Sequence, residues 1–454
     1  MLAPAPAGAT GIMVARFGGE LGNPMADNPT ALYYNPAGIA FSHGTNLYVE
    51  GLFALRSLSF DRDPGGIDNP NRMPGTPTDG IAANSGKNSL LNLITSPFIG
   101  ITTDFGVPNL AVGASLSVPF GGTARWDKND AFATSKYPGA IDGSQRWWDI
   151  EGTIQSVYFT VGGAYRLGNF SIGIAANIIN AKTDDLRAAD ADGSDNLVTG
   201  DGLVLEGRAH LDTSTTAFSI GAGIVWEPIP ELRIGLSYQS QPNFGTITET
   251  GTLDKNLGQT GQTHNEIDHI YSLPDVFRLG ASYNVSKQVQ LRLWGSFERW
   301  SVFTGECLLD KTIATRNCSL NARGVPTQPN AGVVNNIPRF WQDAVAIRAS
   351  GSYYMNPSVE LQLGLGYDGN AVPDKTLELS LPDETKINAT FAAIFRNAFV
   401  NRLNIHVGYS VFFGLERTIA PTDAPFDFPS RVPDSAGTYN QFIGLLDVGV
   451  GYTF

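Results

Sequence analysis

The sequence predicts an all-β membrane protein, a transmembrane barrel of about fourteen antiparallel strands with a small N-terminal segment inside its lumen. Three observations lead to this fold class. From about residue 45 onward, strand-like segments are joined by connectors that are alternately short and long. The segments themselves alternate apolar and polar residues with a period of two. Glycine and aromatic residues are abundant, which suits turns and a pleated surface.

Composition narrows the class of protein. The 454 residues include 51 Gly, 25 Phe, 15 Tyr and 7 Trp, and only 16% are charged. The net charge of −13, with no cluster of Lys or Arg, argues against a nucleic-acid partner. No segment reaches the roughly 18 uninterrupted apolar residues that a transmembrane helix requires. A soluble β-protein or a membrane β-barrel therefore remains.

Residues 1–44 differ from the rest of the chain because they show no sustained alternation. We expect the opening "MLAPAPAGATG" to be a processed or trimmed N-terminus. Further on, "ADNPTALYY" predicts a short helix with Asp27 or Asn28 as its N-cap and Pro29 in its first turn. A segment of this size cannot bury a core of its own, so we expect it to plug the barrel lumen.

Residues 45–454 are expected to form the barrel with long external loops. The predicted short turns are 166–169, 227–231, 284–287, 355–358 and 397–401. The predicted long connectors are 61–90, 121–149, 185–200, 251–262, 305–340, 369–382 and 417–437. An up-and-down transmembrane barrel places all long connectors at one end, whereas a soluble sandwich has no reason to do so.

Alternation is clearest in "LNIHVGYSVFFGLE", residues 403–416, where the odd-numbered positions are apolar and most even-numbered positions are polar or glycine. The segments at 289–298 and 358–369 repeat the pattern. A soluble sheet would turn its polar face outward, but here the uniform apolar face is suited to lipid. The other face predicts a polar lumen wall that includes Arg278, Arg292, Glu298, Arg348, Glu360 and Asp368.

The two cysteines, Cys307 and Cys318, lie close together in the sequence. A disulfide between them would fit an exported protein in an oxidising compartment. The alternative is a pair of unlinked thiols. A metal site fits less well, because two thiols without a nearby histidine supply too few ligands. The final strand ends in Phe454, which resembles the C-terminal signature of bacterial outer-membrane barrels.

The stretch "GGELGNPMADNPTALYYNPAGIA" resembles the N-terminal hatch of the FadL/TodX family of outer-membrane transporters for hydrophobic compounds. The family's Asn-Pro-Ala motif falls on Asn35, Pro36 and Ala37, followed by Gly38. The resemblance implies a fourteen-stranded barrel, a hatch and a passive, ligand-gated channel for long-chain fatty acids or similar compounds. An alternative role within the same family is that of an attachment or shuttle partner for secreted proteins.

The resemblance also implies a lateral opening at an inward kink in the third strand. That strand is expected to be "NLAVGASLSVPFGG", with Gly113 and Pro119 as the candidate kink residues. Pro119 would alternatively just end the strand. Ile12, Met13 and Phe17 are candidate residues of an apolar ligand pocket, and packing against the barrel wall is the simpler role for them.

No enzymatic motif is evident, and we expect no catalytic activity, cofactor or metal. His264 and His269 are interpreted as solvated strand-end residues. The acidic stretch at 190–196 lacks the full ligand spacing of a calcium loop. The expected partners are a hydrophobic small molecule, outer-membrane lipid and lipopolysaccharide, and the chain is expected to act as a monomer in the bacterial outer membrane.

Overall fold

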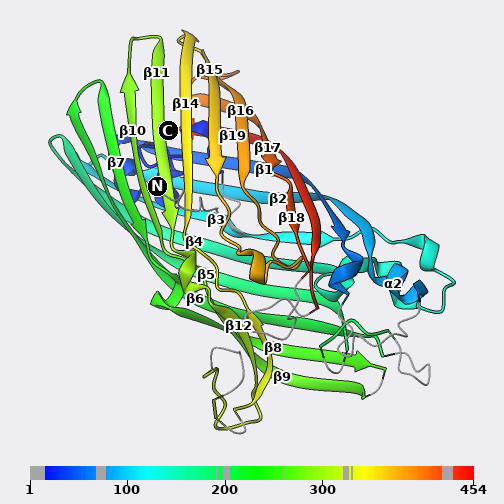
Figure 1. Cartoon of the computed structure of the whole chain (residues 1–454). Helices are drawn as coiled ribbons and strands as arrows, with labels where there is room; N and C mark the ends of the chain where they lie inside the picture. The colour runs from blue at the N-terminus through cyan, green and yellow to red at the C-terminus, as the bar shows by residue number, and fades with distance from the viewer. Residues whose placement is uncertain are drawn as a thin grey trace, which may run out of the picture.

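The computed structural model describes residues 16–67, 78–190, 193–197, 205–258, 260–320, 327–328, 331–421 and 433–454. Its strands form one closed antiparallel sheet in which β1 pairs with β19 to complete the barrel (Figure 1). The wall has fourteen strands, as predicted. Several of them are made of two consecutive segments, for example β7 with β8 and β11 with β12. No helix in the described part of the chain is long and apolar enough to cross a membrane.

The strand segments have the following bounds: β1 Thr45–Arg62, β2 Gly86–Thr103, β3 Leu110–Arg125, β4 Glu151–Leu167, β5 Phe170–Ala189, β6 Gly207–Ile229, β7 Leu232–Gln239, β8 Thr246–Leu257, β9 Gly261–Ser272, β10 Val276–Asn284, β11 Val289–Glu298, β12 Gly305–Asp310, β13 Val333–Pro338, β14 Ala344–Asn356, β15 Val359–Asp368, β16 Lys386–Phe395, β17 Leu403–Gly414, β18 Arg417–Ile419 and β19 Gly437–Thr453. The helices are short: η1 Gly19–Leu21, α1 Ala31–Tyr34, η2 Pro36–Phe41, η3 Pro64–Gly66, α2 Thr78–Asn84, η4 Asp130–Phe132, η5 Pro138–Asp142, η6 Ser144–Trp147, η7 Pro242–Phe244, η8 Trp300–Val302 and η9 Asp374–Thr376.

The two faces of the wall differ as the alternation predicts. On β15, Leu363 and Leu365 point outward and are 65% and 67% exposed. Glu360 and Gln362 point to the inside of the barrel and are fully buried. An apolar outer face with a polar inner face is the arrangement of a barrel in lipid. On the outer face, the rings of Phe170 and Trp226 stack 5.6 Å apart near the short-turn end, consistent with an aromatic girdle.

Two of the predicted long connectors are wrong. Residues 251–262 are almost entirely strand, because β8 and β9 run to Leu257 and from Gly261. The 305–340 connector likewise contains β12 and β13, which continue the wall beyond β11 and β14. These segments lie at the long-loop end of the barrel, where Figure 1 shows β8, β9 and β12 in its lower part. The outward-facing residues of β8, among them Thr246, Thr248 and Thr250, are exposed and polar, so the apolar alternation is absent there although the strand persists.

The long-loop end has an aromatic core of its own. Five of the tryptophans lie in it, and all five are at most 5% exposed: Trp126, Trp147, Trp148, Trp300 and Trp341. The rings of Trp300 and Trp341 are 4.7 Å apart. Burying such rings ties the loops to the inner side of the strand ends. The loops therefore form a packed cap over the long-loop end of the wall.

Candidate functional site

The Asn-Pro-Ala turn is fixed by the side chain of Asn35, which is fully buried. Asn35 caps η2, since its Oδ1 accepts a hydrogen bond from the Ala37 amide at 3.1 Å and Pro36 occupies the first helical position. Its Nδ2 donates to the carbonyl of Pro24 at 2.8 Å and to that of Ile224 in β6 at 3.0 Å. A single amide thus joins two parts of the hatch to the barrel wall.

The wall accommodates this turn because it carries glycines there. A Cβ on Gly173 would lie 2.3 Å from the Ala37 nitrogen, and one on Gly223 would lie 2.0 Å from Asn35 Oδ1. These two glycines face each other across the β5–β6 ladder. Next to them, Ser171 donates a hydrogen bond to the Ala37 carbonyl at 2.7 Å. The hatch backbone therefore lies directly on the inner wall, with no side chain between them.

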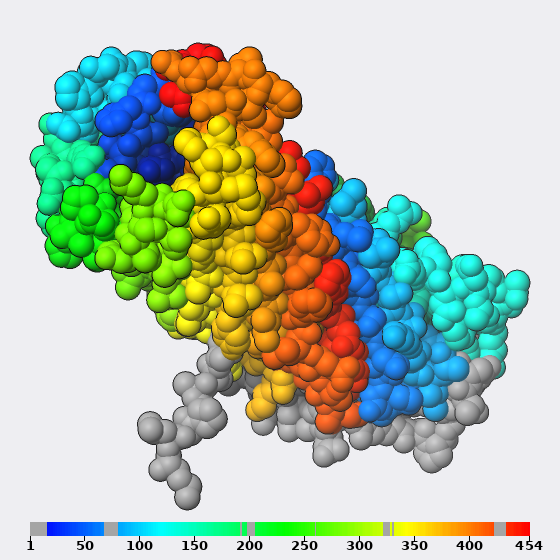
Figure 2. Space-filling view, turned by 90° about the horizontal axis from the view of Figure 1, so that it is seen from above, coloured from blue at the N-terminus to red at the C-terminus, as the bar shows by residue number. Residues whose placement is uncertain are grey.

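A buried ion pair lies at the start of the described hatch. Arg16 Nη2 is 2.7 Å from Glu20 Oε1, and both side chains are almost fully buried. Burial alone would raise the pKa of the Glu20 carboxyl, but the Arg16 guanidinium outweighs it and holds that pKa below its usual value. Figure 2 shows the N-terminal residues, in dark blue, filling the opening ringed by the strands. The hatch closes the bore at this level.

A cavity of about 240 Å³ occupies the lumen on the loop side of the hatch. Tyr33 and Tyr34 of α1 form part of its floor. Its apolar wall residues include Leu52, Ala54, Ile94, Trp294, Phe412, Ile443 and Leu445. Apolar walls with a few polar groups are typical of small-molecule sites. The cavity is the candidate ligand site.

Charged groups also line the cavity, and several of them form ion pairs. Arg348 Nη2 is 2.6 Å from Asp368 Oδ1. Three arginines of the cavity, Arg56, Arg187 and Arg278, have no carboxylate within ion-pair distance among the described residues, and Arg278 is the buried one. Its guanidinium lies 4.7 Å from the centre of the Tyr33 ring. Glu298 on the adjacent strand β11 instead accepts a hydrogen bond from Ser296 at 2.5 Å. Arg278 is thus a buried cation, 3% exposed, beside the apolar floor.

The wall next to the cavity is incompletely paired. β2 and β3 form a ladder only between Phe98–Thr103 and Val112–Ser117. A register shift in β3 between Ser117 and Phe120 places Val118 and Pro119 opposite the single residue Val157 of β4, which is a β-bulge. Beyond the bulge, residues 93–97 of β2 and 118–124 of β3 share no ladder pairing. We call this unpaired stretch the β2–β3 seam.

The seam opens onto the cavity. Ile94 and Ser96 on its β2 side and Gly121 and Gly122 on its β3 side all line the cavity. At its outer end, Asn92 closes the seam with its side chain, which accepts from the Arg125 amide at 2.8 Å and donates to the Arg125 carbonyl at 3.1 Å. The seam is therefore closed at one end by the backbone ladder that begins at Phe98 and at the other end by the side chain of Asn92.

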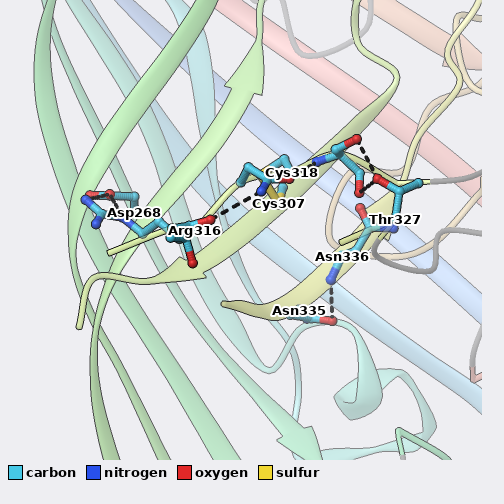
Figure 3. The surroundings of a disulfide bond; sticks show 10 residues. Asp268, Cys307, Arg316, Cys318, Thr327, Asn335 and Asn336 are labelled. Carbon is cyan, nitrogen blue, oxygen red and sulfur yellow. Dashed lines mark hydrogen bonds and ion pairs between the residues drawn. A yellow bond between two sulfur atoms is a disulfide. The ribbon is translucent and has the colours of Figure 1, made fainter. Parts of the chain in front are cut away.

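Cys307 of β12 and Cys318 of the following loop form a disulfide, which fastens that loop to the wall (Figure 3). In the same loop, Arg316 is 2.9 Å from Asp268 of β9. The expected solvated role of His269 is wrong, because this residue is 2% exposed and lies 3.0 Å from Glu306. His264 is exposed and lies 2.6 Å from Asp254.

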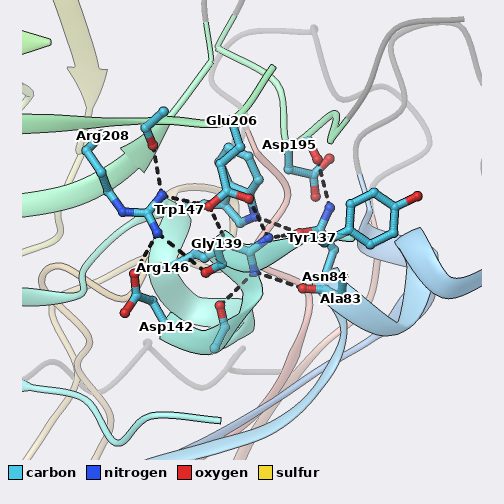
Figure 4. A network of polar contacts seen from close by, with 12 residues as sticks. Ala83, Asn84, Tyr137, Gly139, Asp142, Arg146, Trp147, Asp195, Glu206 and Arg208 are labelled. Carbon is cyan, nitrogen blue, oxygen red and sulfur yellow. Dashed lines mark hydrogen bonds and ion pairs between the residues drawn. The ribbon is translucent and has the colours of Figure 1, made fainter. Parts of the chain in front are cut away.

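A second polar network fastens the β3–β4 loop (Figure 4). Arg146 of η6 pairs with Glu206 at 2.9 Å and also donates to Asn84 Oδ1 at 2.8 Å. Arg208 bridges Glu206 and Asp142 at 2.7 and 2.6 Å. Burial would raise the pKa of the Glu206 carboxyl, but Arg146 and Arg208 hold it below its usual value.

The predicted site residues do not come together at the cavity. Phe17 packs between Tyr33 and Phe98, with ring centres 5.5 and 5.3 Å away, and is not among the residues that line the cavity. Ile12 and Met13 lie outside the described residues, as does part of the 190–196 stretch. Gly113 lies within the regular β2–β3 ladder, where a Cβ would be 3.1 Å from the hatch residue Leu32.

Pro119 lies in the bulge, and β3 continues past it to Arg125. Sequence reasoning did not identify Tyr33 and Tyr34 as cavity residues, although they directly precede the Asn-Pro-Ala motif and aromatic residues there were a usable signal. It also did not identify Gly121 and Gly122, because no local pattern reveals which neighbouring strand leaves them unpaired.

Comparisons with known proteins agree with this architecture. The chain is 25% identical over 341 residues to the long-chain fatty acid transport protein of Escherichia coli O6:H1, covering 68% of this chain and 69% of that protein. It is 21% identical to outer membrane protein P1 of Haemophilus influenzae strain Rd, covering 95% and 90% of the two chains.

Among solved structures, a Pseudomonas aeruginosa FadL homologue superposes with a TM-score of 0.75 at 17% identity, covering 98% of this chain and all of that one. The Pseudomonas putida toluene transporter TodX gives a TM-score of 0.64 at 13% identity, with 94% of each chain covered. The model of one family matches residues 8–454. The chain therefore belongs to the outer membrane protein transport protein family (OMPP1/FadL/TodX).

Proposed function

We propose that this outer-membrane protein is a passive channel in which a hydrophobic molecule enters the cavity from the loop end and leaves sideways through the β2–β3 seam. One observation carries the proposal: residues on both sides of the seam, among them Ser96 and Gly122, line the cavity. A ligand in the cavity is therefore already next to the one stretch of β2 edge that lacks a ladder partner. Membership of a transporter family favours this role over attachment or shuttling of secreted proteins.

A sideways exit also avoids an unfavourable path. Along the barrel axis, the ligand would meet the hatch, whose backbone is hydrogen-bonded to the wall through Asn35 and Ser171. Each CH₂ of a ligand that is left in water costs about 0.8 kcal/mol, so a long chain is strongly disfavoured in an aqueous bore. The seam instead leads to the lipid side, where neighbouring residues such as Leu91 and Leu93 are 61% and 65% exposed.

For the ligand, we propose a long-chain fatty acid or a similar molecule with an apolar tail and an anionic head. Arg278 supports this class, because it is a buried cation beside the cavity floor with no carboxylate partner among the described residues. Some relatives of this chain are named as long-chain fatty acid transport proteins. The hatch would respond to the ligand through Tyr33 and Tyr34, which line the floor and lead directly into the Asn35 turn.

The seam is tested by filling it. A Cβ on Gly122 would meet no atom within 4 Å, so Gly122→Phe places a ring in the opening without a backbone clash. Initial uptake of radiolabelled oleate should fall severalfold in cells that depend on this channel, because the ring occupies the exit. Gly163→Phe, on the β3–β4 side of the wall, is the matched control, since a Cβ there makes only ordinary contacts. Equal uptake by wild type and Gly122→Phe would contradict the lateral route.

The ligand class is tested at Arg278. Arg278→Met keeps the length of the side chain and removes its charge, so binding of oleate to the purified barrel should weaken by about tenfold or more, the equivalent of one charge-assisted hydrogen bond. Binding of oleyl alcohol should change much less. If both ligands lose affinity equally, Arg278 supports the cavity wall and does not recognise a carboxylate.

A further inference from the structure

Three side chains of the barrel meet behind the first turn of the hatch: Glu50 of β1, His406 of β17 and Asp447 of β19. They belong to adjacent strands, since β19 pairs with β1 on one side and with β17 on the other. Glu50 and His406 both lie opposite the same residue of β19, Gly449. The three side chains are 2%, 3% and 1% exposed, and one ligand atom of each lies within 4.8 Å of the other two.

The cluster lacks the donors that its burial demands. Glu50 Oε2 accepts a hydrogen bond from the Gly18 amide at 2.7 Å, but Glu50 Oε1, Asp447 Oδ1 and both ring nitrogens of His406 have no hydrogen-bond partner among the described residues. His406 Nδ1 and Asp447 Oδ1 lie 3.0 Å apart, within ion-pair distance but without hydrogen-bond geometry. The Tyr48 hydroxyl also faces Glu50 and can donate a hydrogen bond to it.

No Lys or Arg among the described residues pairs with either carboxylate of this cluster. A protonated His406 could pair with Asp447, but it would leave the second buried carboxylate, Glu50, without a cation. Such a group is costly in a medium of low dielectric constant. A bound cation would remove that cost. The unpartnered atoms are of the two types that bind transition metals in proteins, imidazole nitrogen and carboxylate oxygen.

A second histidine–carboxylate group in the same barrel shows the contrast. His269 lies 3.0 Å from Glu306 and 3.5 Å from Glu249. The two carboxylates beside His269 already have other partners. Glu249 accepts hydrogen bonds from Thr213 and Tyr271 at 2.6 and 2.8 Å, and Glu306 pairs with Arg339. The carboxylates of that group are satisfied by protein donors, although His269 Nδ1 is not, whereas Glu50 and Asp447 each keep an open oxygen.

We propose that Glu50, His406 and Asp447 bind one divalent transition-metal ion, with Zn²⁺ as the best match to one imidazole and two carboxylates. Zinc bonds to such ligands measure about 2.0–2.2 Å, so in a tetrahedral site the ligand atoms lie about 3.3–3.6 Å apart. The ligand atoms here lie within 4.8 Å of one another, so side-chain rotations that bring them roughly 1 Å closer would complete the site. Three protein ligands leave a fourth position for water.

The ion would also fix the hatch. Glu50 holds the Gly18 amide, and a Cβ on Gly19 would lie 2.6 Å from His406 Cε1 and 3.1 Å from Asp447 Oδ1. The first hatch turn thus lies directly on two of the ligands and is hydrogen-bonded to the third. Metal binding would order this contact and make release of the hatch from β1, β17 and β19 harder.

The test uses the full-length barrel, purified in a mild detergent, stripped with a chelator and then equilibrated with Zn²⁺. We expect one tightly held zinc per chain by elemental mass spectrometry, and a d–d absorption spectrum typical of low coordination number with Co²⁺. His406→Gln and Asp447→Asn should each weaken zinc binding by at least about tenfold, because each removes a ligand. Heat-modifiable migration on gels confirms that each variant barrel is folded.

His264→Gln and His269→Gln are the matched controls. His264 is exposed beside Asp254, and His269 is buried between two carboxylates whose oxygens already accept from protein donors. Both therefore resemble His406 in composition but lack its buried, unpartnered carboxylate oxygens. Both variants should keep the zinc. The proposal is overturned if wild type binds no zinc, or if zinc is lost in His264→Gln while His406→Gln and Asp447→Asn retain it.

Discussion

The two edges of strand β2 differ sharply. On one edge, β2 pairs with β1 along its whole length, from Thr103 opposite Thr45 to Gly86 opposite Arg62. On the other edge, it pairs with β3 only from Phe98 to Thr103. A closed barrel normally leaves no strand edge free, so this interruption is a local feature of the wall.

The difference coincides with an extra residue in β3 and with a proline in β2. One extra residue in β3, at Val118 or Pro119, bends the strand, and β3 then follows β4 up to Arg125. Pro97 lies in β2 where the ladder with β3 stops, and proline removes a ladder donor. One inserted residue in β3, opposite the region of Pro97 in β2, thus accompanies the opening of the barrel wall beside the cavity.

Removing the extra residue should have the largest effect. Deletion of Pro119 leaves Val118 opposite Val157, so the bulge disappears and the β2–β3 ladder can extend across the seam. Uptake of oleate should then fall by about tenfold or more, because closing the bulge removes the proposed exit. The measurement is initial uptake in cells that depend on this channel.

Pro119→Ala is the control for that deletion. It keeps the number of residues in the bulge, so the register and the seam should persist and uptake should stay near the wild-type rate. Normal uptake by the deletion variant would show that the seam is not the exit. A loss in both variants would assign the effect to the proline ring and not to the bulge.

Much of this architecture was predictable from the sequence, because a wall in lipid enforces alternation. Strand β15 carries that signal in full, with Leu363 and Leu365 outside and Glu360 inside. The segments β8 and β9 did not, because their exposed residues are mostly polar, and β12 and β13 are only 6 residues long. The hatch was also locatable, because its Gly and Pro content interrupts every regular pattern.

The site was less predictable, since it depends on which strands meet. The sequence placed Arg278 on the inner face but did not show that Tyr33 of the hatch would lie beneath it. Glu50 and Asp447 are almost 400 residues apart in the chain and become neighbours only when β1 pairs with β19. Barrel closure and hatch docking are long-range events, and local periodicity carries no information about them.

The outer end of the seam offers a smaller change in the opposite direction. Asn92→Ala removes both side-chain hydrogen bonds to Arg125, which together take the place of a ladder pair. The seam should lengthen, and uptake of oleate should rise by about twofold, in keeping with the modest worth of exposed hydrogen bonds. Initial uptake rates measure this effect.

Ser89→Ala, three residues further along β2, is the matched control for Asn92. It removes the hydrogen bond to the Asp127 side chain but leaves the backbone bond from the Asp127 amide to the Ser89 carbonyl, at 2.9 Å. Uptake should therefore be unchanged in this variant. A wild-type rate for Asn92→Ala would mean that other contacts close the outer end.

The smallest expected effect concerns the loop that covers the outer end of β2. There Asn88 donates a hydrogen bond to Ser144 of η6 at 2.6 Å, and Arg146 of the same helix pairs with Glu206. Folding lowers the pKa of the Glu206 carboxyl below its ordinary value of 4.5. The ionised carboxylate therefore contributes its full stabilisation above about pH 4.5, and this stabilisation is lost as the pH falls through the lower pKa of the folded state. Protease cleavage within residues 126–150 should therefore increase only below about pH 4.5.

Glu206→Gln should show the same increase already at pH 7, because Arg146 then lacks its carboxylate while the fold of the wall is unchanged. Asp104→Asn is the control at the other end of β2. The pKa of that carboxyl is also lowered, by the backbone amides of Gly106 and Gly44, but it lies in the short turn, far along the strand from the loop. The contacts of Asn88 and Arg146 indicate that the loop end of β2 is held independently of the short-turn end. If Asp104→Asn increased cleavage of the loop as much as Glu206→Gln, the two ends of β2 would instead be coupled through the seam.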